Sequence, residues 1–321
     1  MATEHVATEL PPDGGTVRVM PQPPTSPPAR PFGAVLTAMV TPFTDDGAVD
    51  LEAAQRLAVH LVENGHDGLV VNGTTGESPT TEDGEQDDLL RAVLEAVGDR
   101  ARIVSGVGTN DTRHTIELAR AAERAGAHGL LVVTPYYSKP PQAGLVAHFT
   151  AVADSTGLPV MLYDIPGRAG VPITPETMFR LAEHDRIVAV KDAKDDLYAA
   201  ATVMSRTDLA WYSGADEANL ALLAQGAAGV VSVVGHVVGP QLAEMVRAMD
   251  AGDLPAAIAA HRSVLPVIEV IMRITQGAIA VKAALEMTGR LPNRWVRLPL
   301  VQADDDTCAR IGAGLKEAGV L

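Results

Sequence analysis

One lysine of this chain stands where an apolar strand ends. Lys191 directly follows Ile187-Val188-Ala189-Val190 and is one of five lysines in the sequence. Burial at such a position disfavours the ammonium form, and the neutral amine that remains can attack a carbonyl carbon to form a Schiff base. The competing interpretation is a lysine whose ammonium reaches solvent past the strand end. The position therefore predicts either imine chemistry or a solvated lysine.

A glycine-rich turn, Gly73-Thr74-Thr75-Gly76-Glu77-Ser78, follows another apolar run. Its backbone N–H groups and hydroxyls next to a helix start suit an anion. No P-loop lysine follows, so we expect a carboxylate here and not a nucleotide. An ordinary loop between a strand and a helix is the alternative.

Three of the five tyrosines, Tyr136, Tyr137 and Tyr163, also lie at predicted strand ends. A phenol beside a Schiff base can relay protons, although these rings could equally form an aromatic lid. Arg168 follows Tyr163 in the segment Tyr163-Asp164-Ile165-Pro166-Gly167-Arg168. Its guanidinium can bind a carboxylate in bidentate fashion, or it can form a surface salt bridge.

Other classes of chemistry have little support in the sequence. The nine histidines form no HxxxH or HxH pair, so no metal site is expected, and no GxSxG motif indicates a serine hydrolase. A net charge of −15 argues against nucleic-acid binding. The longest apolar stretches are about half a membrane span, so no transmembrane helix is expected. The single cysteine, Cys308, excludes an internal disulfide and favours the reducing cytoplasm.

Short apolar runs alternate with segments of helical period from Phe32 onward. Eight such runs predict a (β/α)₈ TIM barrel, with a doubly wound α/β sheet as the alternative. The predicted strands are Val35–Val40, Leu69–Val71, Ile103–Val107, Leu130–Val133, Val160–Tyr163, Ile187–Val190, Ala210–Tyr212 and Val230–Val234.

A Gly-x-x-Gly pattern, repeated from Gly65, Gly126 and Gly226, precedes three of these runs. The first glycine suits a left-handed helix end, and the second suits a tight turn into the strand.

The chain divides into three predicted parts. Residues 1–31 are proline-rich and predict a disordered extension, without the apolar region of a secretory signal. Residues 32–250 would form the catalytic barrel. Residues 251–321 show only helical patterns and predict a C-terminal helical appendage, whose expected role is packing or oligomerisation.

Taken together, the segments GTTGES, VTPYY, LYDIPGR and VKDA resemble the dihydrodipicolinate synthase branch of the pyruvate-dependent class I aldolases. The resemblance runs from about Gly33 to the C-terminus. It implies that Lys191 forms the Schiff base with pyruvate and that Tyr163 donates and accepts protons beside it. Thr74 and Tyr137 would complete a hydroxyl relay, with Tyr137 reaching in from a neighbouring subunit.

The resemblance also implies substrate-binding roles. Thr75 would hold the pyruvate carboxylate, Val231 would line the pyruvate pocket through its backbone, and Gly214 would shape that pocket. Arg168 would receive the carboxylate of L-aspartate 4-semialdehyde. N-acetylneuraminate lyases and keto-sugar-acid aldolases keep the lysine and tyrosine but generally lack this arginine, so they are the alternative branch.

The implied reaction joins pyruvate and L-aspartate 4-semialdehyde into 4-hydroxy-tetrahydrodipicolinate, in diaminopimelate and lysine biosynthesis. It needs no metal or organic cofactor, because the imine supplies the electron sink. The family usually forms a homotetramer built from two tight dimers. A catalytically silent relative that only binds ligands is the alternative from another class, which the complete set of lysine, tyrosines and threonine argues against.

Some positions depart from the family pattern. Lys194 replaces a threonine or serine, and we expect it to face outward; Ala215 replaces a common aspartate, with no predicted effect. In the effector pocket of lysine-inhibited members Asn110 and Tyr136 match, whereas His114 replaces the usual glutamate. Two further positions of that pocket, which are histidines in those members, are occupied here by Asp83 and Gln86. We therefore hypothesise that lysine inhibits weakly or not at all.

Overall fold

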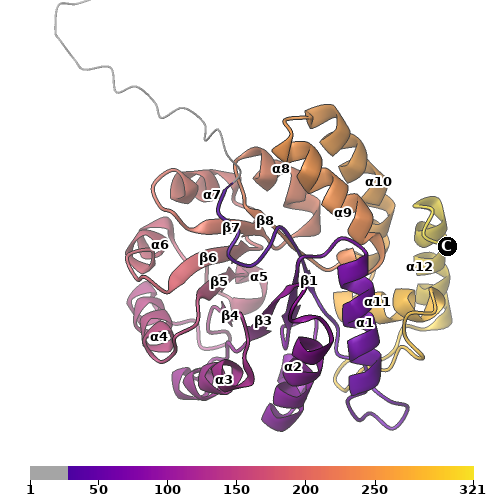
Figure 1. Cartoon of the computed structure of the whole chain (residues 1–321), viewed down its shortest axis with the longest axis horizontal. Coiled ribbons are helices and arrows are strands. Elements are labelled where there is room, and N and C mark those ends of the chain that lie inside the picture. The colour runs from indigo at the N-terminus through magenta and orange to yellow at the C-terminus, as the bar shows by residue number, and fades with distance from the viewer. Residues whose placement is uncertain (1–27) are drawn as a thin grey trace, which may run out of the picture.

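The computed structural model describes residues 28–321, in which eight parallel strands close into one barrel in sequence order (Figure 1). Strand β1 pairs with β8, and Leu36 lies opposite Val231 in that closing register. The predicted TIM barrel is confirmed, and the doubly wound sheet is wrong because an open sheet leaves its edge strands unpaired. The strands are β1 Val35–Ala38, β2 Gly68–Val71, β3 Arg102–Gly106, β4 Gly129–Val133, β5 Val160–Asp164, β6 Ile187–Asp192, β7 Ala210–Ser213 and β8 Gly229–Ser232.

Helices surround the barrel and continue beyond it as the predicted C-terminal helices (Figure 1). The helices are α1 Leu51–Glu63, α2 Asp83–Val97, α3 Thr112–Ala125, α4 Gln142–Asp154, α5 Pro166–Ala169, α6 Pro175–Leu181, α7 Leu197–Met204, α8 Asn219–Ala224, α9 Gly235–Asp250, α10 Leu254–Met272, α11 Gly277–Met287 and α12 Asp305–Glu317. Two short 3-10 helices are η1 Ser78–Thr80 and η2 Asp216–Ala218.

The strands are apolar throughout because both of their faces are buried. Side chains of alternate residues fill the inside of the barrel, while their neighbours pack under the helices. In β6, Ala189 belongs to the inner cluster and Val190 to the outer one, so Lys191 follows on the inner side. Phe32 is fully buried in the same inner cluster, below β1.

The repeated glycines play two different roles. Gly65, Gly126 and Gly226 have φ values of 93°, 93° and 102°, which confirms the predicted left-handed helix ends. The sequence suggested that the second glycines form tight turns, but in the structure they are the first residues of β2, β4 and β8. A Cβ at Gly129 would lie 2.2 Å from the Phe32 ring, and one at Gly229 would lie 2.1 Å from the Ala34 carbonyl oxygen. These glycines make room for packing at the start of each strand.

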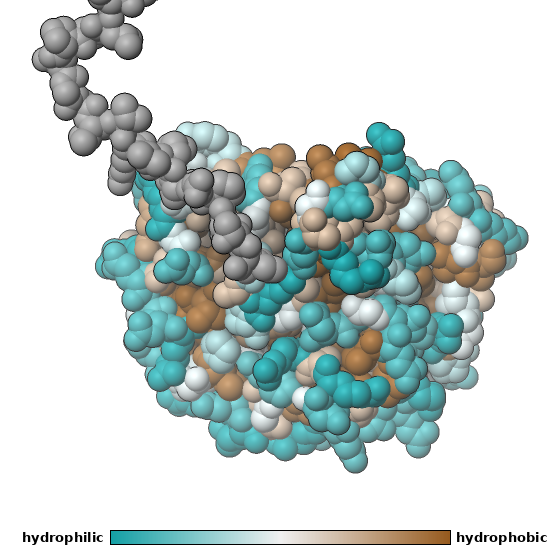
Figure 2. Space-filling model, turned by 45° about the horizontal axis from the view of Figure 1, so that its top comes forward, coloured by the Kyte–Doolittle hydropathy of each residue, from teal (hydrophilic) through white to brown (hydrophobic). Residues whose placement is uncertain are grey.

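The C-terminal helices pack beside the barrel, with α10 against α9 and α12 (Figure 1). Within residues 28–321, α10 is the one helix that is long and apolar enough to cross a membrane by length and composition. This is weak support for a membrane span, because core helices of soluble proteins pass the same test. Val264, Val267 and Ile271 of α10 are buried against the rest of the chain. The face of the molecule in Figure 2 is mostly hydrophilic with scattered apolar patches.

The first described residues are attached to the barrel. The Arg30 guanidinium pairs with Asp250 at the end of α9 (2.7 Å), and its Nε donates to the Ala228 carbonyl (2.7 Å). The disordered extension predicted for residues 1–31 lies, up to residue 27, outside the described residues.

Candidate active site

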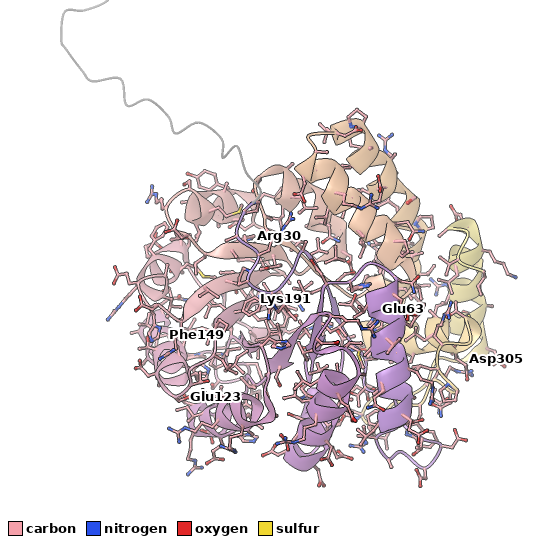
Figure 3. The ribbon with its side chains drawn as sticks, viewed as in Figure 1. Arg30, Glu63, Glu123, Phe149, Lys191 and Asp305 are labelled. Atoms are coloured by element: carbon pink, nitrogen blue, oxygen red, sulfur yellow. The ribbon has the colours of Figure 1, made fainter. Side chains whose placement is uncertain are left out.

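Lys191 and Tyr163 face each other on neighbouring strands inside the barrel. Their Cα atoms are paired in the register of β5 and β6, and the Lys191 Nζ lies 4.2 Å from the centroid of the Tyr163 ring. The two residues are only 4% and 6% exposed. Lys191 lies near the centre of the ring of strands (Figure 3). A buried amine is suited to imine formation, and a tyrosine beside it can move protons.

Gly214 gives the Lys191 side chain its space. A Cβ at this position would lie 2.8 Å from the Lys191 Cγ and 3.0 Å from its Cε. The Gly214 N–H donates to the Asp192 carbonyl (2.7 Å), which fixes the chain at the end of β7 next to β6. The predicted pocket-shaping residue thus packs directly against the stem of the lysine.

The turn after β2 brings Thr74 to the same mouth of the barrel. A cavity of about 30 Å³, the size of one water molecule, is lined by Gly73, Thr74, Ser78 and Tyr163, among others. Thr75 is buried at 9% exposure, and the Thr41 hydroxyl donates to the Gly76 carbonyl (2.6 Å). The turn therefore places Thr74 near Tyr163, and the hydrogen bond from Thr41 holds the backbone of the turn.

Glu77 is an anchor of this turn that the sequence did not single out. It has a φ of 57° and lies 2.5 Å from the Nζ of Lys282 on α11. Its second carboxylate oxygen accepts from the Arg297 backbone N–H (2.9 Å), and Lys282 also donates to the Trp295 carbonyl (2.8 Å). Lys282 is one of only five lysines, and this scarcity was the one signal in the sequence that could have drawn attention to it. No local motif contains it.

Three further predicted residues differ in their surroundings. Tyr137 is 89% exposed with a φ of 72°, so it does not join the Lys191 site within one chain. Arg168 lies on the exposed part of α5, and its guanidinium has no hydrogen bond or ion pair to another residue within 28–321. Val231 is fully buried in β8, with its side chain in the inner cluster that also contains Tyr163.

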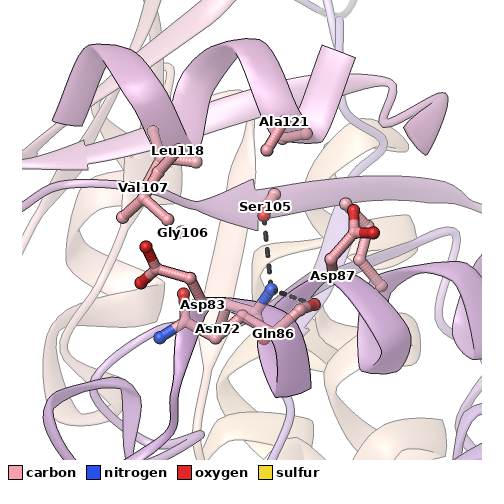
Figure 4. Close-up of a pocket in the computed structure, with 11 residues that line it drawn as sticks. Asn72, Asp83, Gln86, Asp87, Ser105, Gly106, Val107, Leu118 and Ala121 are labelled. Atoms are coloured by element: carbon pink, nitrogen blue, oxygen red, sulfur yellow. Dashed lines mark hydrogen bonds between the residues drawn. The ribbon is translucent and has the colours of Figure 1, made fainter. Parts of the chain in front are cut away.

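Of the effector-pocket positions, Asp83, Gln86, Asn110 and His114 lie near the starts of α2 and α3, whereas Tyr136 follows β4. The His114 Nε2 lies 3.1 Å from Asp83, so a histidine and a carboxylate face each other there. No hydrogen bond or ion pair in the described part of the chain joins the Asn110 or Tyr136 side chain to this pair. Beside it, a cavity of about 20 Å³ is lined by Asp83, Gln86 and Asn72, where the Asn72 amide donates to the Gln86 carbonyl (Figure 4).

The expectation that Lys194 faces outward is wrong. Its side chain is 11% exposed, and its Nζ lies 3.3 Å from the buried carboxylate of Asp164. Asp164 and Asp192, which follow Tyr163 and Lys191, point away from the barrel interior and toward the helices. Lys194 folds back onto these two carboxylates. Burial raises the pKa of Asp164 to about 6, although the Lys194 ammonium opposes that rise.

Asp216 follows the departure at Ala215 and is fully enclosed. It accepts hydrogen bonds from the Ser232 hydroxyl (2.5 Å) and from the backbone N–H groups of Val233 (2.9 Å) and Val234 (3.1 Å). This carboxylate ties the chain after β7 to the end of β8. Burial raises its pKa.

Comparisons with known proteins agree with this architecture. The sequence profile of the dihydrodipicolinate synthetase family matches residues 31–318. The 4-hydroxy-tetrahydrodipicolinate synthase of Kineococcus radiotolerans is 66% identical over 94% of this chain and 98% of its own. The corresponding enzyme of Acidothermus cellulolyticus is 65% identical over 90% of this chain and 93% of its own. A crystal structure of the lysine-bound enzyme from Cyanidioschyzon merolae has a TM-score of 0.89 and 40% identity, and covers 91% of this chain and 100% of that one. The chain belongs to the dihydrodipicolinate synthetase family.

Proposed function

We propose that this enzyme condenses pyruvate with L-aspartate 4-semialdehyde through a Schiff base on Lys191, giving 4-hydroxy-tetrahydrodipicolinate for lysine and diaminopimelate biosynthesis. One observation carries the proposal: the buried Lys191 amine lies 4.2 Å from the centre of the Tyr163 ring. The high identity to enzymes named for this reaction supports the choice of substrates.

The first half of the reaction uses pyruvate alone. The Lys191 amine adds to the keto carbon, water leaves, and loss of a methyl proton converts the imine to an enamine nucleophile. Tyr163 is the group best placed to pass the protons, with Thr74 across the small cavity as the next hydroxyl. Thr75 would hold the carboxylate, while Gly214 and the backbone of Val231 would bound the pocket.

The second half uses the aldehyde. The enamine carbon attacks the aldehyde of L-aspartate 4-semialdehyde while Arg168 binds its carboxylate in bidentate fashion. The substrate's own amine then displaces Lys191 from the imine carbon, which closes a six-membered ring and regenerates the enzyme. Atoms balance without an oxidant or reductant, and this proposal requires neither a metal nor an organic cofactor.

The oligomer is part of the proposal. Tyr137 projects into solvent at 89% exposure, which suits a residue that completes the hydroxyl relay of a second copy. We therefore infer at least a tight dimer, and a homotetramer of two such dimers as the working assembly. The single cysteine, Cys308, which is free, favours the cytoplasm.

Borohydride trapping tests the chemistry. Reduction in the presence of pyruvate should attach one pyruvyl group to the peptide that contains Lys191, and Lys191→Arg should show none. A coupled assay with pyruvate and L-aspartate 4-semialdehyde, beside N-acetylneuraminate and a keto-sugar acid, tests the substrates. Full activity of Arg168→Ala with the semialdehyde would contradict the assignment to this branch.

A further inference from the structure

The segment that carries Arg168 is closed at its base by a buried ion pair. Asp164 precedes this segment and Ile173 follows it, and the Asp164 Oδ1 accepts from the Ile173 backbone N–H (3.1 Å). The Lys194 Nζ lies 3.3 Å from the other Asp164 oxygen and 3.5 Å from the Ile173 carbonyl oxygen. Lys194 thus contacts the residues at both ends of the loop, Asp164 and Ile173.

Lys194 is itself tied to the strand that carries the proposed catalytic lysine. Its backbone N–H donates to the Asp192 Oδ1 (2.9 Å), and the Asp192 Oδ2 accepts from the Trp211 indole (3.2 Å). The Ala193 N–H donates to the Asp164 carbonyl (2.9 Å). Because Lys191 lies at the end of the same strand, Lys194 connects the Arg168 segment to the Schiff-base position through short, buried contacts.

Asp164 and Lys194 have few other partners for their charges. Asp164 is 1% exposed, Asp192 lies opposite it in the strand register, and Lys194 supplies the one cation in contact with Asp164 among the described residues. Removing one member of a buried ion pair leaves an uncompensated charge in a low dielectric. The 3.3 Å contact between Lys194 Nζ and Asp164 Oδ2 does not have the geometry of a hydrogen bond, so it is an ion pair.

We propose that Lys194 is a positioning residue that sets the affinity for the second substrate by holding both ends of residues 165–172. The Arg168 guanidinium makes no hydrogen bond or ion pair to another residue within 28–321, so its place relative to Lys191 depends on the backbone that carries it. The far end of the segment has a separate tether, because the Gln142 amide donates to the Pro172 carbonyl (2.8 Å). Lys194 therefore shares the far end with Gln142 and is the side chain that contacts both ends of the segment. This inference rests on the proposed function.

The experiment compares Lys194→Met with Lys194→Arg and with Lys316→Met, a matched control on the exposed face of α12. Lys194→Met should raise the KM for L-aspartate 4-semialdehyde by about tenfold to a hundredfold, since small misplacements of a binding group have effects of that size. The pyruvate KM and the borohydride adduct on Lys191 should stay as in the parent. Lys194→Arg should recover part of the affinity, and Lys316→Met should change neither KM.

The double variant Lys194→Met/Asp164→Asn separates positioning from folding. It removes the unpaired buried carboxylate, so its melting temperature should return toward that of the parent, while the semialdehyde KM stays raised. An unchanged semialdehyde KM in Lys194→Met, or an equal rise in both KM values, would overturn the inference. Absence of a pyruvyl adduct in the parent protein would instead overturn the proposed function.

Discussion

The Nζ of Lys282 lies 2.5 Å from the Oε1 of Glu77, and both side chains are 1% exposed. This contact joins a helix of the C-terminal region to the turn that carries Thr74 and Thr75. The ammonium also lies 4.1 Å from the centre of the Phe43 ring, an arrangement that favours a cation. Burial lowers the pKa of Lys282 to about 8, against the opposing effect of the Glu77 carboxylate. The C-terminal helices thus do more than cover the barrel, because they hold the turn that carries Thr74 and Thr75.

Lys282→Met should therefore both destabilise the protein and weaken pyruvate binding. Breaking a buried pair from one side costs about 3–5 kcal/mol of unfolding free energy, which urea denaturation can measure. Steady-state kinetics should show a raised KM for pyruvate. In the double variant Lys282→Met/Glu77→Gln most of the stability should return, because no uncompensated charge remains. A loss below about 1 kcal/mol in the single variant would contradict this role.

Tyr163→Phe should remove the proton relay and keep the ring beside Lys191. We expect the turnover rate to fall by about 10²- to 10⁴-fold, the range for a lost general acid or base. The fold should survive, as circular dichroism and melting would show. Tyr198→Phe is the control, since that phenol is 84% exposed on α7. Similar rates for the two variants would remove Tyr163 from the mechanism.

A complementation experiment tests whether Tyr137 serves a neighbouring subunit. Tyr137→Phe and Lys191→Arg each give defective homomers, and a mixed dimer contains one site with an intact lysine and an intact tyrosine. Purified through two different tags, such a dimer should show about half of the parent activity, because one of two symmetric sites is complete. No recovery in the mixed dimer would show that Tyr137 acts within its own chain.

Buried histidines should make the fold sensitive to acid. Burial lowers the pKa of His66 and of His148 to about 4 and that of His236 to about 3. The unfolded chain binds these protons near pH 6.5 and the folded chain only near pH 4, so the stability that these histidines contribute is lost as pH falls through that window, while the raised pKa of Asp164 acts in the opposite direction. Each group contributes about 1.4 kcal/mol per pH unit there.

Denaturant unfolding between pH 4.5 and pH 7 checks this acid sensitivity. His148→Gln should keep the contact with Thr112 and lower the pH slope by about one proton. The same slope in parent and variant would mean that His148 does not contribute to the acid sensitivity.

Lysine should inhibit weakly. The effector's amine needs a carboxylate, which His114 does not supply, and the Asp83 carboxylate already faces the His114 imidazole at 3.1 Å. We expect half-inhibition above about a millimolar, which corresponds to about 4 kcal/mol of binding free energy. A lysine titration in the coupled assay measures it, with His114→Glu as the comparison that should strengthen inhibition. Tight inhibition of the parent would show that this pair does not block the amine.

Much of this protein followed from local sequence pattern. All eight apolar runs became strands, with ends shifted by one or two residues, because strands buried on both faces carry a continuous apolar signal. In the structure, the alternation of side chains along β5 and β6 places Tyr163 and Lys191 on the same inner face. The order of the motifs along the chain therefore determined the barrel and the two neighbouring strands that carry Tyr163 and Lys191.

Only the tertiary structure decided which distant residues hold those side chains in place. Glu77 and Lys282 are 205 positions apart, and no periodicity relates an α11 lysine to a turn after β2. Lys194 was expected to face outward, yet it pairs with Asp164 at the end of the neighbouring strand β5. Contacts of this kind depend on how the barrel closes and how its loops fold back, and a linear pattern records neither.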